Sequence, residues 1–260
     1  LGSIANSVNE PEFAVKVCSR ALEIGDVSFG PPPVEVDGAL LLVEAAYTKA
    51  QCLSKKLEAL GVINGIDDEI VTEETPEVEA AEVDEEGSDE EEDNTELTPE
   101  EKAAASQTKR EMIKALLDGM EKSHEFQQGW MVANGLAHWW NLHLDISKLC
   151  HADPSWLDRT LQEYRDGLKT IQKYFYGPAA LLAEDFNDRL VGSLVLANLN
   201  VSVHFGDLTV LGDDKLMVLK RLDANQRKEV VSRVTELCKK KEKPTPDLAK
   251  LRPERLEGAP

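Results

Sequence analysis

The residues best suited to chemistry gather in one stretch, GWMVANGLAHWWNLHLDI, which runs from Gly129 to Ile146. It holds three of the four tryptophans and two of the five histidines of the chain. Zinc prefers imidazole and thiolate ligands, and two such ligands on one helix stand four residues apart. His138 and His143 are five apart, which rotates one from the other by about 140°. Cys150 and His151 are neighbours and point in different directions, so we expect no metal and no cofactor.

The sequence also lacks the motifs that prepare a residue for catalysis. It contains no H-E-x-x-H zinc motif, no glycine-rich phosphate loop and no G-x-S-x-G turn. Its serines, histidines and aspartates show no spacing that would activate a nucleophile. We therefore expect no catalytic residue and no enzymatic activity. The opposing hypothesis is a metal-dependent or hydrolytic enzyme built on the Trp/His stretch.

The Trp/His stretch is better explained as a buried helix. On a helix, its apolar side chains cover almost the whole circumference, which is typical of a helix enclosed by others. One narrow polar line escapes, formed by Asn134, His138, Asn141 and Asp145. These side chains either face solvent or form hydrogen bonds that fix how neighbouring helices pack. The residues expected in the structural core are Trp130, Val132, Asn134, Leu136, Trp139, Trp140, Asn141, Leu161, Leu168, Phe186 and Leu194.

The negative charge of the chain is concentrated in one segment. The formal net charge is −20, but 19 of the 49 acidic residues lie between Asp67 and Glu101, where no Lys or Arg occurs. That leaves 30 acidic residues against 29 basic ones elsewhere. A segment of this composition buries too little apolar surface to offset its chain entropy, and we expect it to be disordered. No concentrated basic face suits a nucleic acid, and no apolar run suits a membrane.

Helical periodicity dominates the remainder of the chain. Two antiparallel helices are expected before residue 61, joined by a linker at 31–33. The apolar stripes lie at Phe13, Val17, Ala21 and Ile24, ending at Gly25, and at Ala39, Val43, Ala46, Ala50, Leu53, Leu57 and Leu60, ending at Gly61. The predicted organisation is therefore a helical pair at 1–66, an acidic disordered linker at 67–97, a helical-repeat core at 98–241 and a Pro-rich tail at 242–260.

Capping signals mark the helices of the predicted core. Thr98, followed by Pro99 and by Glu101 three residues after the cap, predicts a helix start. Asp153 and Pro154 predict another, which an apolar stripe continues from 157 to 175. A further stripe from 182 to 201 predicts a helix of about 25 residues. After a loop at 206–212, helices are expected near 213–222 and 224–241.

Long helices joined by short turns favour antiparallel neighbours stacked in chain order. The expected fold class is all-α, with antiparallel helical hairpins stacked as a degenerate tetratricopeptide-like α-solenoid and a disordered acidic insertion. The strict 34-residue tetratricopeptide pattern is not met, because Ala133 and Asn134 stand where Leu and Gly are required after Trp130.

A family resemblance rests on the pattern Trp130-x-Val132-x-Asn134 followed by Trp140-Asn141. This pattern resembles a helix of the large tetratricopeptide-like proteins of the ciliary central apparatus, the families of cilia- and flagella-associated proteins 46 and 54. The resemblance covers roughly residues 127–198 and does not include the acidic segment.

The resemblance implies a structural scaffold of the axoneme in motile cilia and flagella. Such a protein would build a projection on a central microtubule and contribute to the control of beating. Its partners would be other central-apparatus proteins in a large hetero-complex, with direct or indirect microtubule association, and no nucleic acid or membrane. The alternative is a generic cytoplasmic helical-repeat adaptor. Because the chain starts at Leu1, we expect an interior piece of a longer protein or a trimmed chain.

Overall fold

The computed structural model describes residues 10–28, 36–67, 97–176 and 187–246. Within these ranges every regular element is a helix, and the only β pairing is an isolated antiparallel bridge between Ile66 and Thr160. The fold class is therefore all-α. The predictions for the acidic segment at 68–96, for Phe186 and for the tail after residue 246 lie outside the described residues.

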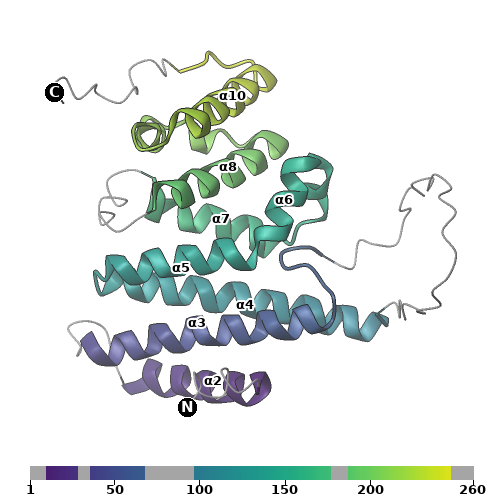
Figure 1. The fold of residues 1–260 in the computed structure, drawn as a ribbon, viewed down its shortest axis with the longest axis vertical. Coiled ribbons are helices and arrows are strands. Elements are labelled where there is room, and N and C mark those ends of the chain that lie inside the picture. Colours follow the sequence, from purple (N-terminus) through teal and green to yellow (C-terminus); the bar gives the residue numbers. More distant parts are fainter. Residues whose placement is uncertain (1–9, 29–35, 68–96, 177–186, 247–260) are drawn as a thin grey trace, which may run out of the picture.

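The helices lie in layers that follow the order of the chain. Figure 1 shows α2 at one end of the stack, α3, α4 and α5 above it, then α7 and α8, and α10 at the other end. The bounds are α2 Pro11–Ser28, α3 Val36–Ala59, α4 Pro99–Glu125, α5 Gly129–Leu142, α6 Leu144–Ala152, α7 Gln162–Phe175, α8 Asp188–Phe205, α9 Asp213–Leu216 and α10 Ala224–Lys240. Three 3-10 helices add η2 Pro154–Arg159, η4 Leu208–Leu211 and η5 Met217–Lys220.

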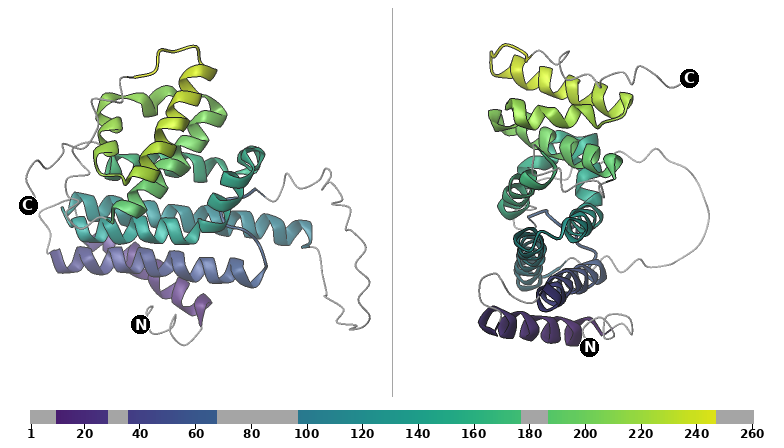
Figure 2. Two further views of the ribbon diagram at one scale, coloured as in Figure 1. Left: turned by 45° about the horizontal axis from the view of Figure 1, so that its top comes forward. Right: turned by 90° about the vertical axis from the view of Figure 1, so that its left-hand side faces the viewer.

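Helix α2 lies obliquely across α3 and runs in the opposite direction (Figure 2). Glu12 near its start pairs with Lys56 near the end of α3 at 3.5 Å, and Gly25 near its end packs against Leu42. The prediction that Gly25 ends the helix is wrong, because α2 continues to Ser28. A Cβ at position 25 would lie 2.3 Å from a Leu42 methyl group, so the glycine serves close packing instead.

Tyr47 joins α3 to both α4 and α5. Its hydroxyl donates a hydrogen bond to the Met131 carbonyl oxygen at 3.0 Å. Its ring fills a slot between two glycines, since a Cβ would come within 2.6 Å of the ring at Gly119 and within 2.3 Å of the hydroxyl at Gly135. Tyr47 is 5% exposed, so this aromatic ring sets the spacing of three helices.

The loop after α3 ties the lower layers to the upper ones. The Asn64 amide donates to the Leu142 carbonyl at the end of α5 at 2.8 Å. The buried Lys109 ammonium donates to the Ile66 carbonyl at 3.1 Å, and Leu161 N–H donates to the Gly65 carbonyl at 2.8 Å. The chain therefore enters the acidic segment from a fixed point.

The chain returns from the acidic segment at the start of α4, where the predicted cap is present. The Thr98 side chain accepts from the Glu101 backbone N–H, and the Glu101 carboxylate accepts from the Thr98 backbone N–H at 2.8 Å. This reciprocal pair satisfies two of the backbone donors that a helix leaves free at its N-terminus.

Two predicted helices are each divided in two. The helix predicted over the Trp/His stretch ends at Leu142, and α6 starts at Leu144. The break coincides with two hydrogen bonds to backbone carbonyl oxygens, one from the His143 side chain to Trp139 and one from the Asn64 amide to Leu142. The single helix expected from Asp153 to Phe175 is replaced by two elements. The 3-10 helix η2 comes first, the chain is extended at Thr160, and α7 follows. Thr160 is extended because it forms the bridge to Ile66.

Near the other end, the predicted helix at 213–222 is a single turn, α9, followed by the 3-10 helix η5, and the predicted loop at 206–212 contains η4. Gly206 ends α8 with φ +69°.

One apolar core runs without interruption from Val43 in α3 to Cys238 in α10. Among the described residues, no helix is both long enough and apolar enough to cross a bilayer.

The Tyr47 slot predicts that Gly135→Ala destabilises the chain. Overpacking costs about 1 to 3 kcal/mol, and the better helix propensity of alanine returns less than about 1 kcal/mol. Tyr47→Phe removes the nearest clashing atom, so the double variant should lose less stability than the two single losses combined. Urea unfolding of all four proteins measures this coupling. Additive losses would contradict the slot.

Candidate functional site: the groove between helices α2, α3 and α5

Helix α5 has two distinct faces. Its buried residues are Met131, Val132, Gly135, Leu136 and Trp139. The opposite line is Trp130, Asn134, His138 and Asn141, spaced by four, four and three residues. Trp130 therefore precedes the predicted polar line by one helical turn and belongs to it. Asp145 leaves that line because it lies on α6, where it pairs with Lys148 at 3.2 Å.

The predicted core residues separate along these faces. The structure buries Val132, Leu136, Trp139, Leu161, Leu168 and Leu194. Trp140 is half-buried, whereas Asn134 and Asn141 are exposed. Trp130 is 45% exposed, so the predicted core positions of Trp130, Asn134 and Asn141 are wrong. Within the described residues, only part of the circumference of α5 is enclosed, because Trp130, Asn134 and Asn141 are exposed on one side of the helix.

Trp139 carries the packing of this helix against α7. It is 1% exposed and stacks on Tyr164 with ring centroids 6.0 Å apart and an interplanar angle of 10°. A Cβ at Gly167 would lie 2.3 Å from the indole. The glycine thus lets α7 approach the indole ring directly, and Trp139 fills space instead of lining a cavity.

His143 is buried beside the same indole. Its Nδ1 donates to the Trp139 carbonyl at 2.9 Å, because a carbonyl oxygen only accepts. Its Nε2 is buried and has no hydrogen-bond partner among the described residues. Burial lowers the pKa of His143 to about 4, although the bond to Trp139 opposes the shift. His143 is therefore a neutral residue of the core and does not converge with His138.

His138 and Trp130 instead line an open groove of about 500 Å3 beside α2. Trp130, Met131, Asn134 and His138 come from α5; Leu41, Glu44, Ala45, Tyr47, Thr48 and Gln51 come from α3; Val17, Cys18 and Ala21 come from α2. Leu41 is 67% exposed. Two large apolar side chains therefore face solvent across one hollow.

The polar groups of this groove hold its walls together. The Gln51 amide nitrogen lies 3.2 Å from His138 Nδ1, which links α3 to α5. The His138 ring also lies against Tyr47, with centroids 5.3 Å apart. Burial lowers the pKa of His138 and raises that of the Cys18 thiol. Both groups are therefore neutral near pH 7, and Glu44 is the charged residue of the lining.

Leu41 was missed by the sequence analysis, although a signal was present. Leu40, Leu41 and Leu42 are consecutive, and residues on a helix turn by about 100° each. Three successive leucines cannot all face one core. Leu42 is buried, and Leu41 points to the groove.

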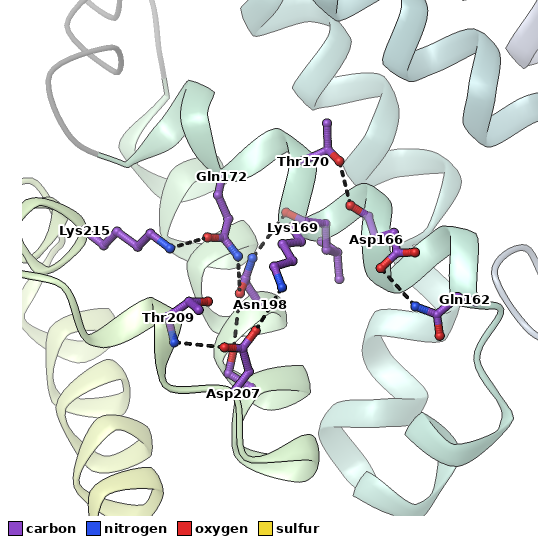
Figure 3. A network of polar contacts seen from close by, with 11 residues as sticks. Gln162, Asp166, Lys169, Thr170, Gln172, Asn198, Asp207, Thr209 and Lys215 are labelled. Carbon is purple, nitrogen blue, oxygen red and sulfur yellow. Dashed lines mark hydrogen bonds and ion pairs between the residues drawn. The ribbon is translucent and has the colours of Figure 1, made fainter. Parts of the chain in front are cut away.

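A second, smaller hollow of about 240 Å3 lies between α7 and α8. Figure 3 shows its polar network. The Gln172 amide donates to Asn198 Oδ1 at 3.1 Å, Lys215 donates to Gln172 Oε1 at 2.9 Å, and Asn198 donates to the Leu168 carbonyl at 3.2 Å. Gln172 and Asn198 interrupt the apolar stripes of α7 and α8, which is the sequence signal for a buried polar pair.

The rim of this second hollow is also paired. Asp207 accepts from the Thr209 N–H at 2.9 Å and lies 3.6 Å from the Lys169 ammonium. Burial would raise the pKa of Asp207, but these two neighbours lower it below its usual value. The Arg165 guanidinium covers the Phe205 ring at 4.7 Å. These bonds fix α7, α8 and α9 in register, so the α2–α3–α5 groove is the better candidate for binding.

In the part of the chain that the structure describes, no three His, Cys, Asp or Glu side chains gather closely enough to hold a metal ion.

Comparison with protein-family models, with curated proteins and with solved structures returned no match for this chain.

The two faces of α5 predict opposite outcomes for two tryptophan substitutions. Trp139→Ala should destabilise the chain by about 3 to 5 kcal/mol, because it empties a filled core site. Trp130→Ala, its matched control on the open face, should cost about 1 kcal/mol or less. Chemical denaturation compares the two variants, and equal losses would contradict the assignment of the faces.

Buried His143 predicts a loss of stability in mild acid. Its pKa is about 4 in the folded chain, against the ordinary histidine value of 6.5, so the unfolded state binds the proton more readily below pH 6.5. Stability should therefore fall as the pH drops from about 6.5 towards 4, by about 2 kcal/mol from this residue between pH 7 and 5.

The pH effect is measured by urea unfolding of the chain and of His143→Gln at pH 7 and pH 5. The variant should lose less stability on acidification than the unsubstituted chain does. His151→Gln, at an exposed histidine, is the control and should keep the full dependence. An unchanged dependence in His143→Gln would contradict the role of this residue.

Proposed function

We propose that this chain is a non-catalytic scaffold subunit of the central apparatus in motile cilia and flagella. It would build part of a projection on a central microtubule through contacts between its helices and neighbouring proteins, and so contribute to the control of beating. Its partners would be other central-apparatus proteins in a large hetero-complex.

The scaffold part of the proposal is carried by one observation, the exposure of large apolar side chains along the stack. Monomeric proteins bury most such groups, and exposed clusters mark sites of interaction. Leu41 and Trp130 stand across one groove near α2, and Phe205 and Met217 are each 45% exposed in the upper layers. Layered helices support this reading because their grooves bind partner segments without a preformed pocket.

The ciliary part of the proposal rests on the resemblance of the Trp130–Asn141 segment. A relationship to cilia- and flagella-associated protein 46, with protein 54 as the second candidate, would make the layers a degenerate tetratricopeptide-like solenoid. Within the resembling segment of this chain, Val132 is 3% exposed and lies on the core side of α5. Trp130 and Asn134 would then mark the side turned to a neighbour.

The acidic segment adds a constraint on orientation. Nineteen acidic residues without a base between positions 67 and 101 would be repelled by another strongly acidic surface. Microtubules expose an acidic surface, so direct contact with the lattice would use other faces of the chain. The acidic segment would point away from the microtubule or meet a basic neighbour.

The ciliary proposal predicts that the tagged chain stays with the central microtubules after detergent extraction of isolated axonemes. Quantitative blotting compares normal axonemes with axonemes that lack the central pair. Retention should fall to background in the second sample. Equal retention in both samples would contradict the proposal, and recovery only in the detergent-soluble fraction would favour a generic cytoplasmic adaptor.

A further inference from the structure

Helix α2 carries an apolar stripe whose two end residues are exposed. Phe13, Val17, Ala21 and Ile24 follow one another at helical spacing. Phe13 is 54% exposed and Ile24 is 49% exposed. The residues of α2 that are fully buried are small, namely Ala14, Cys18 and Gly25, and Val15 packs half-buried beside them. Two of the largest apolar side chains of this helix, Phe13 and Ile24, are therefore exposed in the described structure.

This stripe is continuous with the groove described above. Val17 and Ala21 belong to the stripe and also line the groove, across from Leu41 and Trp130. From Phe13 to Ile24 the stripe extends over about three helical turns, or roughly 16 Å. Its length and its apolar anchors match those of a groove that receives one amphipathic helix.

The charges favour a basic occupant. Glu44 is exposed in the wall of the groove, and within the described ranges no ion pair neutralises it. Burial lowers the pKa of His138, so the histidine adds no positive charge there, and burial raises the pKa of the Cys18 thiol, so the thiol adds no negative charge. The net charge of −20 arises almost entirely from the acidic segment at 67–101. It attracts cationic partners to the molecule and opposes the approach of a second copy at long range, whereas the charge of the groove lining itself is that of Glu44.

We propose that the groove between α2, α3 and α5 docks a basic amphipathic helix of a partner protein. Apolar side chains on one face of that helix contact Leu41, Trp130 and Val17, and a Lys or Arg beside them pairs with Glu44. This inference deepens the proposed scaffold function and rests on it only in that the chain binds other proteins.

The probe is an 18-residue peptide of leucine and lysine, with leucines at positions i, i+3, i+4 and i+7 of a helix. It is titrated into the 15N-labelled 260-residue chain at 0.5 M salt, which screens contacts with the acidic segment. The four tryptophan indole N–H signals report where the peptide binds. The Trp130 signal should move with saturation, and the Trp156 signal, which comes from η2, should not.

Two substitutions separate apolar docking from charge pairing. Leu41→Asp should weaken binding about 10- to 100-fold, because one anchor is lost. Met217→Asp replaces a comparably exposed apolar residue elsewhere and should leave binding unchanged. Glu44→Lys should weaken binding about two- to fivefold and should improve binding of a matched leucine–glutamate peptide. Thermal melting verifies that each variant is folded.

Several outcomes would overturn the proposal. They are equal binding of a scrambled leucine–lysine peptide, binding that leaves the Trp130 signal unmoved, and tighter binding of the leucine–glutamate peptide to the unsubstituted chain. A dimer in sedimentation that Leu41→Asp abolishes would assign the face to a second copy. Failure here leaves the axonemal retention test unaffected, so the two proposals fail separately.

Discussion

The insertion of Tyr47 between two glycines is the constraint on which the described structure depends most. An aromatic ring from α3 passes between α4 and α5 only because positions 119 and 135 have no side chain. Its hydroxyl then bonds the Met131 carbonyl at the first turn of α5. Because a ring is rigid and a carbonyl has a fixed direction, this contact sets both the distance and the rotation of α5 relative to α3.

The rotation of α5 decides which chemistry becomes available at the surface. With Met131 held by Tyr47, the adjacent Trp130 is turned away from the core and towards α2. The same rotation brings His138 to Gln51 on α3 at 3.2 Å. The packing of Tyr47 in the core therefore also positions the groove residues of α5. We expect a substitution at Gly119 or Gly135 to change the geometry of the groove as well as the stability of the chain.

Much of the fold follows from local signals, and the site follows from contacts that are distant in sequence. Helical periodicity and the Thr98 capping box predict all-helical structure and the start of α4. No local pattern places Asn64 at the end of α5, 78 residues away, or pairs Ile66 with Thr160. Those contacts divide two helices that periodicity joins. The exposure of Trp130 was predictable in part, since its spacing of four from Asn134 already puts it on the polar line.

The uneven use of small and large residues on α2 gives the strongest reason to regard this end of the stack as an interface. A helix that served only as a cover for α3 would bury its large apolar residues and present polar ones to water. On α2, Ala14, Cys18 and Gly25 are buried, whereas Phe13 and Ile24 are exposed. The small residues bring α2 close to α3, and Val17 and Ala21, which belong to the same apolar stripe as Phe13 and Ile24, line the groove with Leu41 and Trp130. Covering these exposed apolar side chains would remove them from water and so lower the free energy. Within the described ranges, Glu44 in the adjoining groove has no ion pair, and the packing of α2 therefore supports the proposed docking of a partner at this face.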